Sequence, residues 1–248
     1  MEPILEINNI SYSYHTLEGE TPALSNLSFT VPKGKFVSLV GPSGCGKSTL
    51  LSILTNLITP EQGNFVFHGT SVGYMLQKDH LLEWRTVLKN VLLGLEIQHR
   101  ITPEAIEKAK SLLSQYGLHN FENAKPSELS GGMRQRAALI RTLLLEPELL
   151  LLDEPFSALD YQTRLLVSDD IGQILRAEKK SALLVTHDLS EAISLSDTIV
   201  ILTKRPGTVK SIIPLQFHLE VDTPLNRRNS PEFKTYFNSV WKEIDSHE

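Results

Sequence analysis

The sequence predicts an α/β protein with a phosphate-loop core, in which a largely parallel sheet carries surrounding helices and a helical insertion. A short apolar run, Phe36–Val40, leads directly into the glycine-rich stretch Gly41–Thr49. A second apolar run, Leu149–Leu152, ends on two adjacent carboxylates. Continuous apolar runs of this length are typical of strands buried on both faces, as in parallel sheets. Residues 87–145, between the two runs, have helical character and form the predicted insertion.

Further strands are expected where apolar residues alternate with polar ones, or where short apolar runs lie between turn residues. They cover Ile4–Ile10, Leu27–Val31, Phe65–Phe67, Val72–Leu76, Ala182–Val185, Thr198–Leu202 and Val209–Pro214. The stretch from His15 to Pro22 is expected to be a polar loop between the first two strands. A short polar tail is expected after the last strand.

Helices are expected after the glycine-rich stretch and within the insertion. Leu50–Leu57 follows the glycines directly. In the insertion, Thr102 is a predicted N-cap and Pro103 occupies the first helical position, so that Ala105–Tyr116 forms a helix. A second helix of the insertion is expected to begin near Ser130.

Composition limits the classes of protein to consider. With 248 residues and 41% hydrophobic content, the chain can form one domain with an insertion or a short tail. A net charge of -5 argues against a protein that coats nucleic acid. The single cysteine, Cys45, cannot form an intrachain disulfide and points to a reducing compartment. The acidic start gives no secretory signal, and charges interrupt the richest apolar region, Ala137–Leu152, so no membrane-spanning helix is expected.

The glycine-rich stretch matches the phosphate-loop pattern G-x-x-x-x-G-K-[ST]. Its glycines let backbone N–H groups curl around phosphates. Lys47 would reach the β and γ phosphates of ATP, and Ser48 would place its hydroxyl on Mg²⁺. The residues predicted to form this nucleotide site are Gly41, Pro42, Ser43, Gly44, Cys45, Gly46, Lys47, Ser48 and Thr49.

The two carboxylates after Leu149–Leu152 supply the other half of an ATPase site. A carboxylate at the end of a buried strand can lie beside the phosphate loop, so Asp153 is the expected Mg²⁺ partner. Glu154 would orient or deprotonate the attacking water. The sequence therefore predicts hydrolysis of ATP as well as binding.

A third motif lies in the insertion, at Ser130-Gly131-Gly132. Exposed backbone amides at a helix N-terminus attract anions. Since the phosphate loop already holds the nucleotide from one side, this motif is expected to meet a nucleotide held by another copy of the fold. Met133 follows the two glycines directly, and its side chain leaves the backbone amides unchanged.

Taken together, these motifs resemble the ATP-binding cassette ATPases, the nucleotide-binding subunits of ABC transporters. The resemblance covers nearly the whole chain and implies a single nucleotide-binding domain over residues 1–248. Residues 1–77 and 146–215 would form the ATPase core with an N-terminal antiparallel β subdomain. Residues 78–145 would form the helical subdomain, and residues 216–248 a short C-terminal tail. The family also implies a head-to-tail dimer around two ATP.

The resemblance assigns roles to four more residues. Gln77 matches the glutamine that joins core and insertion and senses Mg²⁺ and the attacking water. Asp160, in the loop Ser157–Asp160, matches an acid that contacts the opposite protomer, although it can equally cap the following helix. His187 matches the histidine that contacts the γ-phosphate. Tyr14 aligns best with the aromatic residue that stacks on adenine, and Tyr12 is the competing choice.

Leu81–Val91 resembles the corresponding stretch of the nitrate, sulfonate and taurine importer branch. There Leu81, Leu82 and Trp84 would form an apolar patch for the permease, or Trp84 would pack into the insertion. Arg205-Pro-Gly207 before the last strand fits the same branch. The branch implies two copies of this chain, transmembrane permease subunits, a solute-binding protein, and a peripheral place on the cytoplasmic face of the cell membrane.

The resemblance implies that this subunit does not contact the solute, so its sequence does not choose among sulfonates, nitrate, taurine and small heterocyclic vitamin precursors. The alternatives are a transporter for another small solute, an exporter, or an ABC ATPase without a transport role. A small phosphate-loop kinase is disfavoured, because phosphotransfer does not require the Ser130-Gly131-Gly132 motif. The expected partners do not include nucleic acid.

Overall fold

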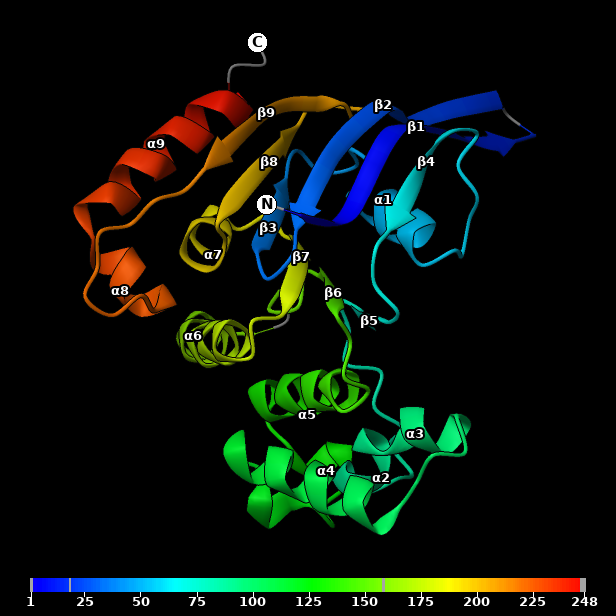
Figure 1. The fold of residues 1–248 in the computed structure, drawn as a ribbon, viewed down its shortest axis with the longest axis vertical. Helices are drawn as coiled ribbons and strands as arrows, with labels where there is room; N and C mark the ends of the chain where they lie inside the picture. The colour runs from blue at the N-terminus through cyan, green and yellow to red at the C-terminus, as the bar shows by residue number, and fades with distance from the viewer. Residues whose placement is uncertain (1, 18, 158, 246–248) are drawn as a thin grey trace.

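The computed structural model describes residues 2–17, 19–157 and 159–245 (Figure 1). Its larger sheet has six strands in the order β5-β6-β7-β3-β8-β9. Five run parallel, and only β9 is antiparallel to its neighbour β8. The strands are β3 (Phe36–Val40), β5 (Val72–Met75), β6 (Leu149–Asp153), β7 (Ser181–Val185), β8 (Thr198–Leu202) and β9 (Val209–Pro214). The predicted α/β core with a largely parallel sheet is confirmed.

The N-terminal part forms a separate antiparallel sheet of three strands in the order β2-β1-β4. These strands are β1 (Pro3–Thr16), β2 (Gly19–Pro32) and β4 (Gln62–Phe67). The prediction of a polar loop from His15 to Pro22 is wrong. Strands β1 and β2 continue as a paired hairpin through this stretch, with His15 opposite Glu20. Antiparallel strands can expose one face to water, so polar side chains do not end the backbone pairing.

The helical insertion extends away from the two sheets in Figure 1. It contains α2 (Val87–Val91), α3 (Leu93–Ile97), α4 (Pro103–Gln115) and α5 (Gly131–Leu143), with the 3-10 turns η1 (His119–Phe121) and η2 (Pro126–Glu128). The Thr102 side chain accepts a hydrogen bond from the Ala105 amide, as expected for the N-cap of α4. Apolar residues of α4 and α5 join one cluster with Phe156 and the buried face of the next helix, α6 (Tyr161–Ala177).

The helix after the phosphate loop, α1 (Lys47–Leu54), begins three residues before the predicted start at Leu50. Gly46, its N-cap, has φ 100°, a left-handed conformation that lets the chain turn sharply into the helix. Leu50, Leu51 and Ile53 are fully buried against the sheets. The loop is therefore held between a buried strand and a buried helix.

The C-terminal tail is not the short polar segment that the sequence suggested. It forms α8 (Pro224–Asn229) and α9 (Pro231–Asp245). One face of α9 packs against β8 and α7 (Leu189–Leu195), with Val240 fully buried. Apolar residues recur every three or four positions along α9, the spacing of a helix with one buried face. They are Phe233, Tyr236, Phe237, Val240 and Ile244.

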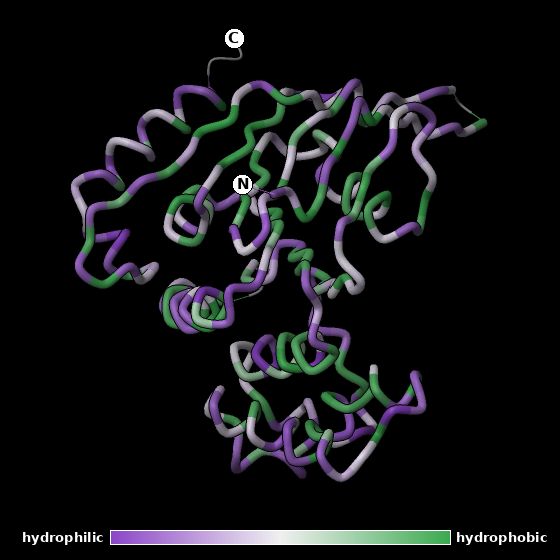
Figure 2. Tube along the Cα trace, in the orientation of Figure 1, coloured by the Kyte–Doolittle hydropathy of each residue, from purple (hydrophilic) through white to green (hydrophobic). Residues whose placement is uncertain are grey.

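Figure 2 shows where apolar residues gather: in the strands of the larger sheet and in α5, whereas α9 is mixed. Within the described ranges, no helix has both the length and the apolar character needed to cross a membrane.

Candidate nucleotide-binding and hydrolysis site

The phosphate loop closes tightly at Gly46. A Cβ atom there would lie 2.5 Å from Leu24 Cδ2 and 2.8 Å from the carbonyl oxygen of Ala23. With its positive φ, this position accepts glycine and strains any other residue. The loop backbone therefore lies directly against β2 of the antiparallel sheet.

The Lys47 side chain folds back onto the phosphate loop. Its Nζ donates hydrogen bonds to the carbonyl oxygens of Gly41, at 2.8 Å, and Pro42, at 3.1 Å. The side chain is buried, yet it has no carboxylate partner within the described chain. An ammonium group held only by carbonyls and a thiol can turn to phosphate oxygens, which carry full negative charge.

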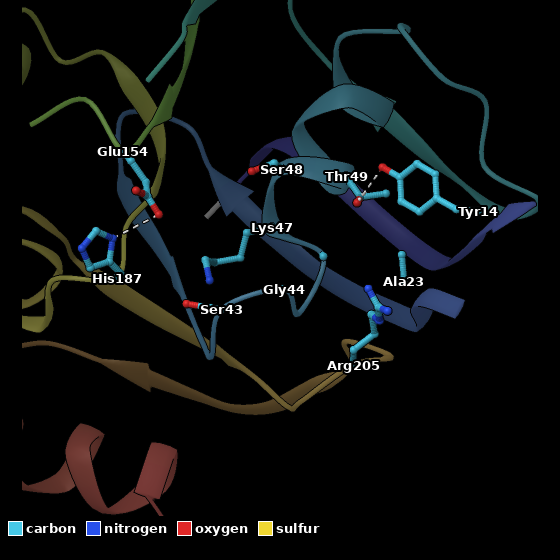
Figure 3. Close-up of a pocket in the computed structure, with 11 residues that line it drawn as sticks. Tyr14, Ala23, Ser43, Gly44, Lys47, Ser48, Thr49, Glu154, His187 and Arg205 are labelled. Carbon is cyan, nitrogen blue, oxygen red and sulfur yellow. Dashed lines mark hydrogen bonds and ion pairs between the residues drawn. The ribbon is translucent and has the colours of Figure 1, made fainter. Parts of the chain in front are cut away.

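A cavity of about 370 Å³ opens beside the loop (Figure 3). Glu154 and His187 lie at one end of it, and Tyr14 lies at the other, with Lys47 and Gly44 between them. Its lining residues are Tyr14, Ala23, Ser43, Gly44, Gly46, Lys47, Ser48, Thr49, Glu154, His187 and Arg205. The elongated arrangement suits a ligand with phosphates at one end and an aromatic group at the other.

Asp153 lies at the end of β6, next to the loop. Burial raises the pKa of Asp153, and the neighbouring charge of Glu154 raises it further, while Ser48 and Lys47 act in the opposite direction. The Tyr74 hydroxyl donates a hydrogen bond to Asp153 Oδ2 at 3.5 Å, and burial raises the pKa of Tyr74 to about 12. Two adjacent carboxylates in a partly desolvated place, beside a serine hydroxyl, form an oxygen-rich donor set that fits Mg²⁺.

Glu154 contacts two of the other predicted catalytic side chains, Gln77 and His187. Its Oε1 lies 3.1 Å from His187 Nδ1, and its Oε2 accepts a hydrogen bond from Gln77 Nε2 at 3.3 Å. Glu154 has φ 44°, and its amide donates to the carbonyl of Val185 in β7. Three segments that are far apart in the sequence thus meet at Glu154, which lines the cavity.

The structure separates the two tyrosines that the sequence left as alternatives. Tyr14 lines the cavity, is 43% exposed, and lies with its hydroxyl 3.1 Å from Thr49 Oγ1. Tyr12 packs against the apolar cluster beneath the sheet and meets Tyr14 edge-on, with ring centroids 5.1 Å apart. Of the two tyrosines, Tyr14 lines the cavity and Tyr12 does not, and the stacking of Tyr14 on adenine stays a prediction.

The Ser130-Gly131-Gly132 segment begins α5, as expected. The Ser130 side chain accepts a hydrogen bond from the Met133 amide at 3.4 Å, and both Ser130 and Gly131 are exposed. None of the three is among the residues that line the cavity. The partly buried Met133 side chain packs against the core of the insertion.

Asp160 caps the next helix, with its Oδ1 accepting a hydrogen bond from the Thr163 amide at 3.0 Å. Hydrogen bonding to Thr163 lowers the pKa of Asp160. The capping role is therefore present, and contact with an opposite protomer stays a prediction. Ala158, in the same predicted loop, lies outside the described residues.

Sequence reasoning did not assign two cavity residues, Ala23 and Arg205. Ala23 is in the first half of β2, and nothing in its surroundings in the sequence points to a ligand. Arg205 belongs to the Arg205-Pro-Gly207 segment, which the sequence analysis relates to the importer branch but not to the nucleotide site. The signal in the sequence that could have indicated a ligand contact is a positively charged residue shortly after a core strand.

Comparison with known proteins decides the family. The family model described as ABC transporter matches residues 24–157, more than half of the chain. The chain belongs to the ABC transporter family. It is an ATPase subunit, and the ATP hydrolysis it performs is coupled to transport.

Individual relatives agree with this assignment. An uncharacterized ABC transporter ATP-binding protein of Bacillus subtilis, YtlC, is 45% identical over 98% of this chain and 96% of its own length. The aliphatic sulfonates import ATP-binding protein SsuB of Bacillus licheniformis is 40% identical over 92% of this chain and 89% of its own. Among solved structures, the ABC subunit resembles the ATP-binding cassette MJ0796, a dimer bound to ADP and Pi, with a TM-score of 0.75 and 29% identity. That match covers 86% of this chain and 100% of the other.

A buried carboxylate lies just beyond His187. Glu191 of α7 is 3% exposed and accepts a hydrogen bond from Thr186 Oγ1 at 2.7 Å. Arg164 Nε is 3.8 Å from its Oε1. Burial raises the pKa of Glu191 from 4.5 to about 7.

This raised pKa predicts how stability depends on pH. The folded ABC subunit keeps the Glu191 proton up to about pH 7, whereas the unfolded chain releases it near pH 4.5. The stabilising contribution is therefore complete below pH 4.5 and is lost as the pH rises through 7. We expect Glu191→Gln, which keeps a neutral acceptor for Thr186, to become more stable relative to the native protein as the pH rises from 5 to 8, by up to about 3 kcal/mol. Urea unfolding at each pH measures this, and a constant difference would contradict it.

Proposed function

We propose that this chain is the ATP-hydrolysing subunit of an importer, in which two copies enclose two ATP and drive uptake of a small solute through a separate permease. The observation that carries the proposal is the meeting of Gln77, Glu154 and His187 beside the phosphate loop. A site built only to bind a nucleotide does not require this carboxylate with its two partners.

The chemistry follows from the positions of these groups. The Lys47 ammonium would leave the Gly41 and Pro42 carbonyls and bind the β and γ phosphates. Ser48, Asp153 and Gln77 would hold Mg²⁺, which supplies charge neutralisation at the phosphates when bound. Glu154 would accept a proton from the attacking water.

The neighbours of Glu154 keep its carboxylate in position for this step. Gln77 donates to one oxygen, and His187 lies against the other. With ATP bound, the exposed His187 ring would turn to the γ-phosphate, as the family resemblance implies. Gln77 also reaches Ser157 Oγ, at 3.4 Å, so it links the catalytic carboxylate to the loop before α6.

The head-to-tail pair is supported by the position of the α5 N-terminus. Ser130 and Gly131 expose backbone at this positive helix end, and neither lines the cavity of its own chain. An anion held there would come from outside the chain, and the γ-phosphate of a second copy fits this chemistry. The dimeric state of the structural relative MJ0796 supports the same arrangement.

The permease surface is proposed near Trp84, which is 73% exposed. The alternative that Trp84 packs into the insertion is not supported. The predicted patch needs one correction, because Leu81 is buried in the core of the insertion and its place is fixed by a hydrogen bond from its amide to Asp79. Leu76, 40% exposed at the end of β5, is close in sequence and offers further apolar surface.

The subunit would lie on the cytoplasmic face of the membrane, and a solute-binding protein would act with it indirectly. The sulfonate importer name of SsuB and the Leu81–Val91 pattern support a sulfonate-like, nitrate-like or taurine-like solute. Another small solute, or export, is the alternative. The match to the family model described as ABC transporter disfavours a role outside transport.

Purification from membranes tests this function. We expect the tagged chain to bring down a permease and a solute-binding protein, and Trp84→Ala to reduce permease recovery about tenfold while isolated ATPase activity is kept. The matched control is Trp241→Ala, because Trp241 on α9 is the other tryptophan and is 55% exposed. Recovery of ribosomes or DNA in place of a permease would overturn the transport role.

A further inference from the structure

The turn between β8 and β9 contacts both β2 and the phosphate loop, beside the nucleotide cavity. The Gly207 amide donates to the carbonyl of Ala23 at 2.9 Å, and the Ser25 amide donates to the carbonyl of Gly207 at 3.0 Å. A Cβ atom at Gly207 would lie 2.1 Å from the carbonyl oxygen of Cys45 in the phosphate loop. Glycine therefore lets the turn lie directly on the loop backbone.

Hydrogen bonds within the turn fix its shape. The Thr203 amide donates to the carbonyl of Thr208 at 3.0 Å, and the Thr208 amide donates to Thr203 Oγ1 at 3.0 Å. Thr203 Oγ1 also donates to the carbonyl of Pro206 at 3.2 Å. The residue at the tip, Arg205, is thus presented from a well-supported backbone.

Arg205 lines the nucleotide cavity and is exposed. In Figure 3 its side chain points toward Ala23, on the Tyr14 side of Gly44 and away from Glu154. In the described parts of the chain, its guanidinium has no carboxylate and no hydrogen-bond acceptor as a partner. Its five donors are therefore available to a ligand.

We propose that Arg205 is a further nucleotide-binding residue, which contacts ATP between its base and its β-phosphate, at the ribose and the α-phosphate. This rests on the proposed orientation of ATP, with Lys47 at the β and γ phosphates and Tyr14 at the base. Arg205 lies between these two ends, where a nucleotide offers ribose hydroxyls and a charged phosphate oxygen. A guanidinium group suits such acceptors because it presents several donors in one plane.

The experiment compares ADP binding by calorimetry to the native subunit, to Arg205→Gln and to Lys204→Gln. Lys204 precedes Arg205 in the same turn and does not line the cavity, so the control removes the same charge without the proposed contact. We expect ADP to bind Arg205→Gln about 5- to 20-fold more weakly, the loss typical of one partly exposed charged hydrogen bond. Lys204→Gln should bind within about twofold of the native subunit.

Turnover gives an independent readout of the same contact. Since Arg205 lies away from Glu154 and His187, its removal should raise the KM for ATP and leave kcat within about twofold. Thermal unfolding of the nucleotide-free variants should match the native protein.

The outcomes separate this inference from the proposed function. Equal ADP affinity for Arg205→Gln and the native subunit, or equal weakening in both glutamine variants, would overturn the role of Arg205 and leave the proposed function intact. Failure of the native subunit to bind ADP or ATP would instead refute the nucleotide site on which both depend.

Discussion

Glu154→Gln is expected to lower ATP turnover by about 10²- to 10⁴-fold while ATP binding is kept. Glutamine has the size of glutamate and can still hydrogen-bond to Gln77 and His187, but it cannot accept the proton of the attacking water. In the proposed dimer, ATP would hold the two copies together until it is hydrolysed, so the variant should accumulate as an ATP-bound dimer. Phosphate release assays and gel filtration with and without ATP measure the two effects.

A matched control exists at the other end of the same strand, because Glu148 and Glu154 flank β6 on its two sides. Glu148 lies at the opposite end of β6, where it accepts hydrogen bonds from the Thr70 amide and hydroxyl, and Gln can replace it as an acceptor. Glu148→Gln should therefore hydrolyse ATP at the native rate and dimerise only transiently. Substantial ATPase activity in Glu154→Gln would refute the role of Glu154 as the base.

Ser130→Arg is expected to abolish ATP-dependent dimerisation, and with it turnover, while the monomer still binds ATP. Ser130 is exposed at the N-terminus of α5, where the proposed γ-phosphate of the second copy would lie, and an arginine side chain would fill that space. Loss of the N-cap hydrogen bond to Met133 costs about 1 kcal/mol, too little to unfold the domain. Gel filtration with ATP and calorimetry of ATP binding separate the two properties.

The control for size and charge is Ser127→Arg. Ser127 is exposed in η2, three residues before Ser130, and it is not part of the helix N-terminus. This variant should dimerise and hydrolyse ATP normally. An Ser130→Arg protein that still forms an ATP-dependent dimer of normal stability would contradict the head-to-tail arrangement.

Much of the core was predictable because its signals are local. The strands Phe36–Val40, Thr198–Leu202 and Val209–Pro214 have the predicted bounds, since each is a short run between turn residues. The His15–Pro22 loop was mispredicted because hairpin pairing overrode its polar composition. The prediction of a short polar tail was wrong because the apolar residues of α9 pack on β8 and α7, which are distant in the sequence.

The choice between Tyr12 and Tyr14 shows a second limit of sequence reasoning. Simple alternation places residues two positions apart on the same face of a strand. In β1 the pairing register shifts between Tyr12 and Ser13, a local irregularity that alternation does not anticipate. One ring therefore packs into the core cluster, and the other reaches the cavity.

The sequence by itself determined the phosphate loop and the acidic pair, because these depend on residue types at fixed short spacings. Glycines, a lysine and two carboxylates carry that chemistry wherever a strand and a helix flank them. Only the tertiary structure decided which separate segments meet: Gln77 and His187 at Glu154, and Arg205 at the nucleotide cavity. The reason is physical, since these contacts arise from strand order and backbone packing between residues that no local pattern relates.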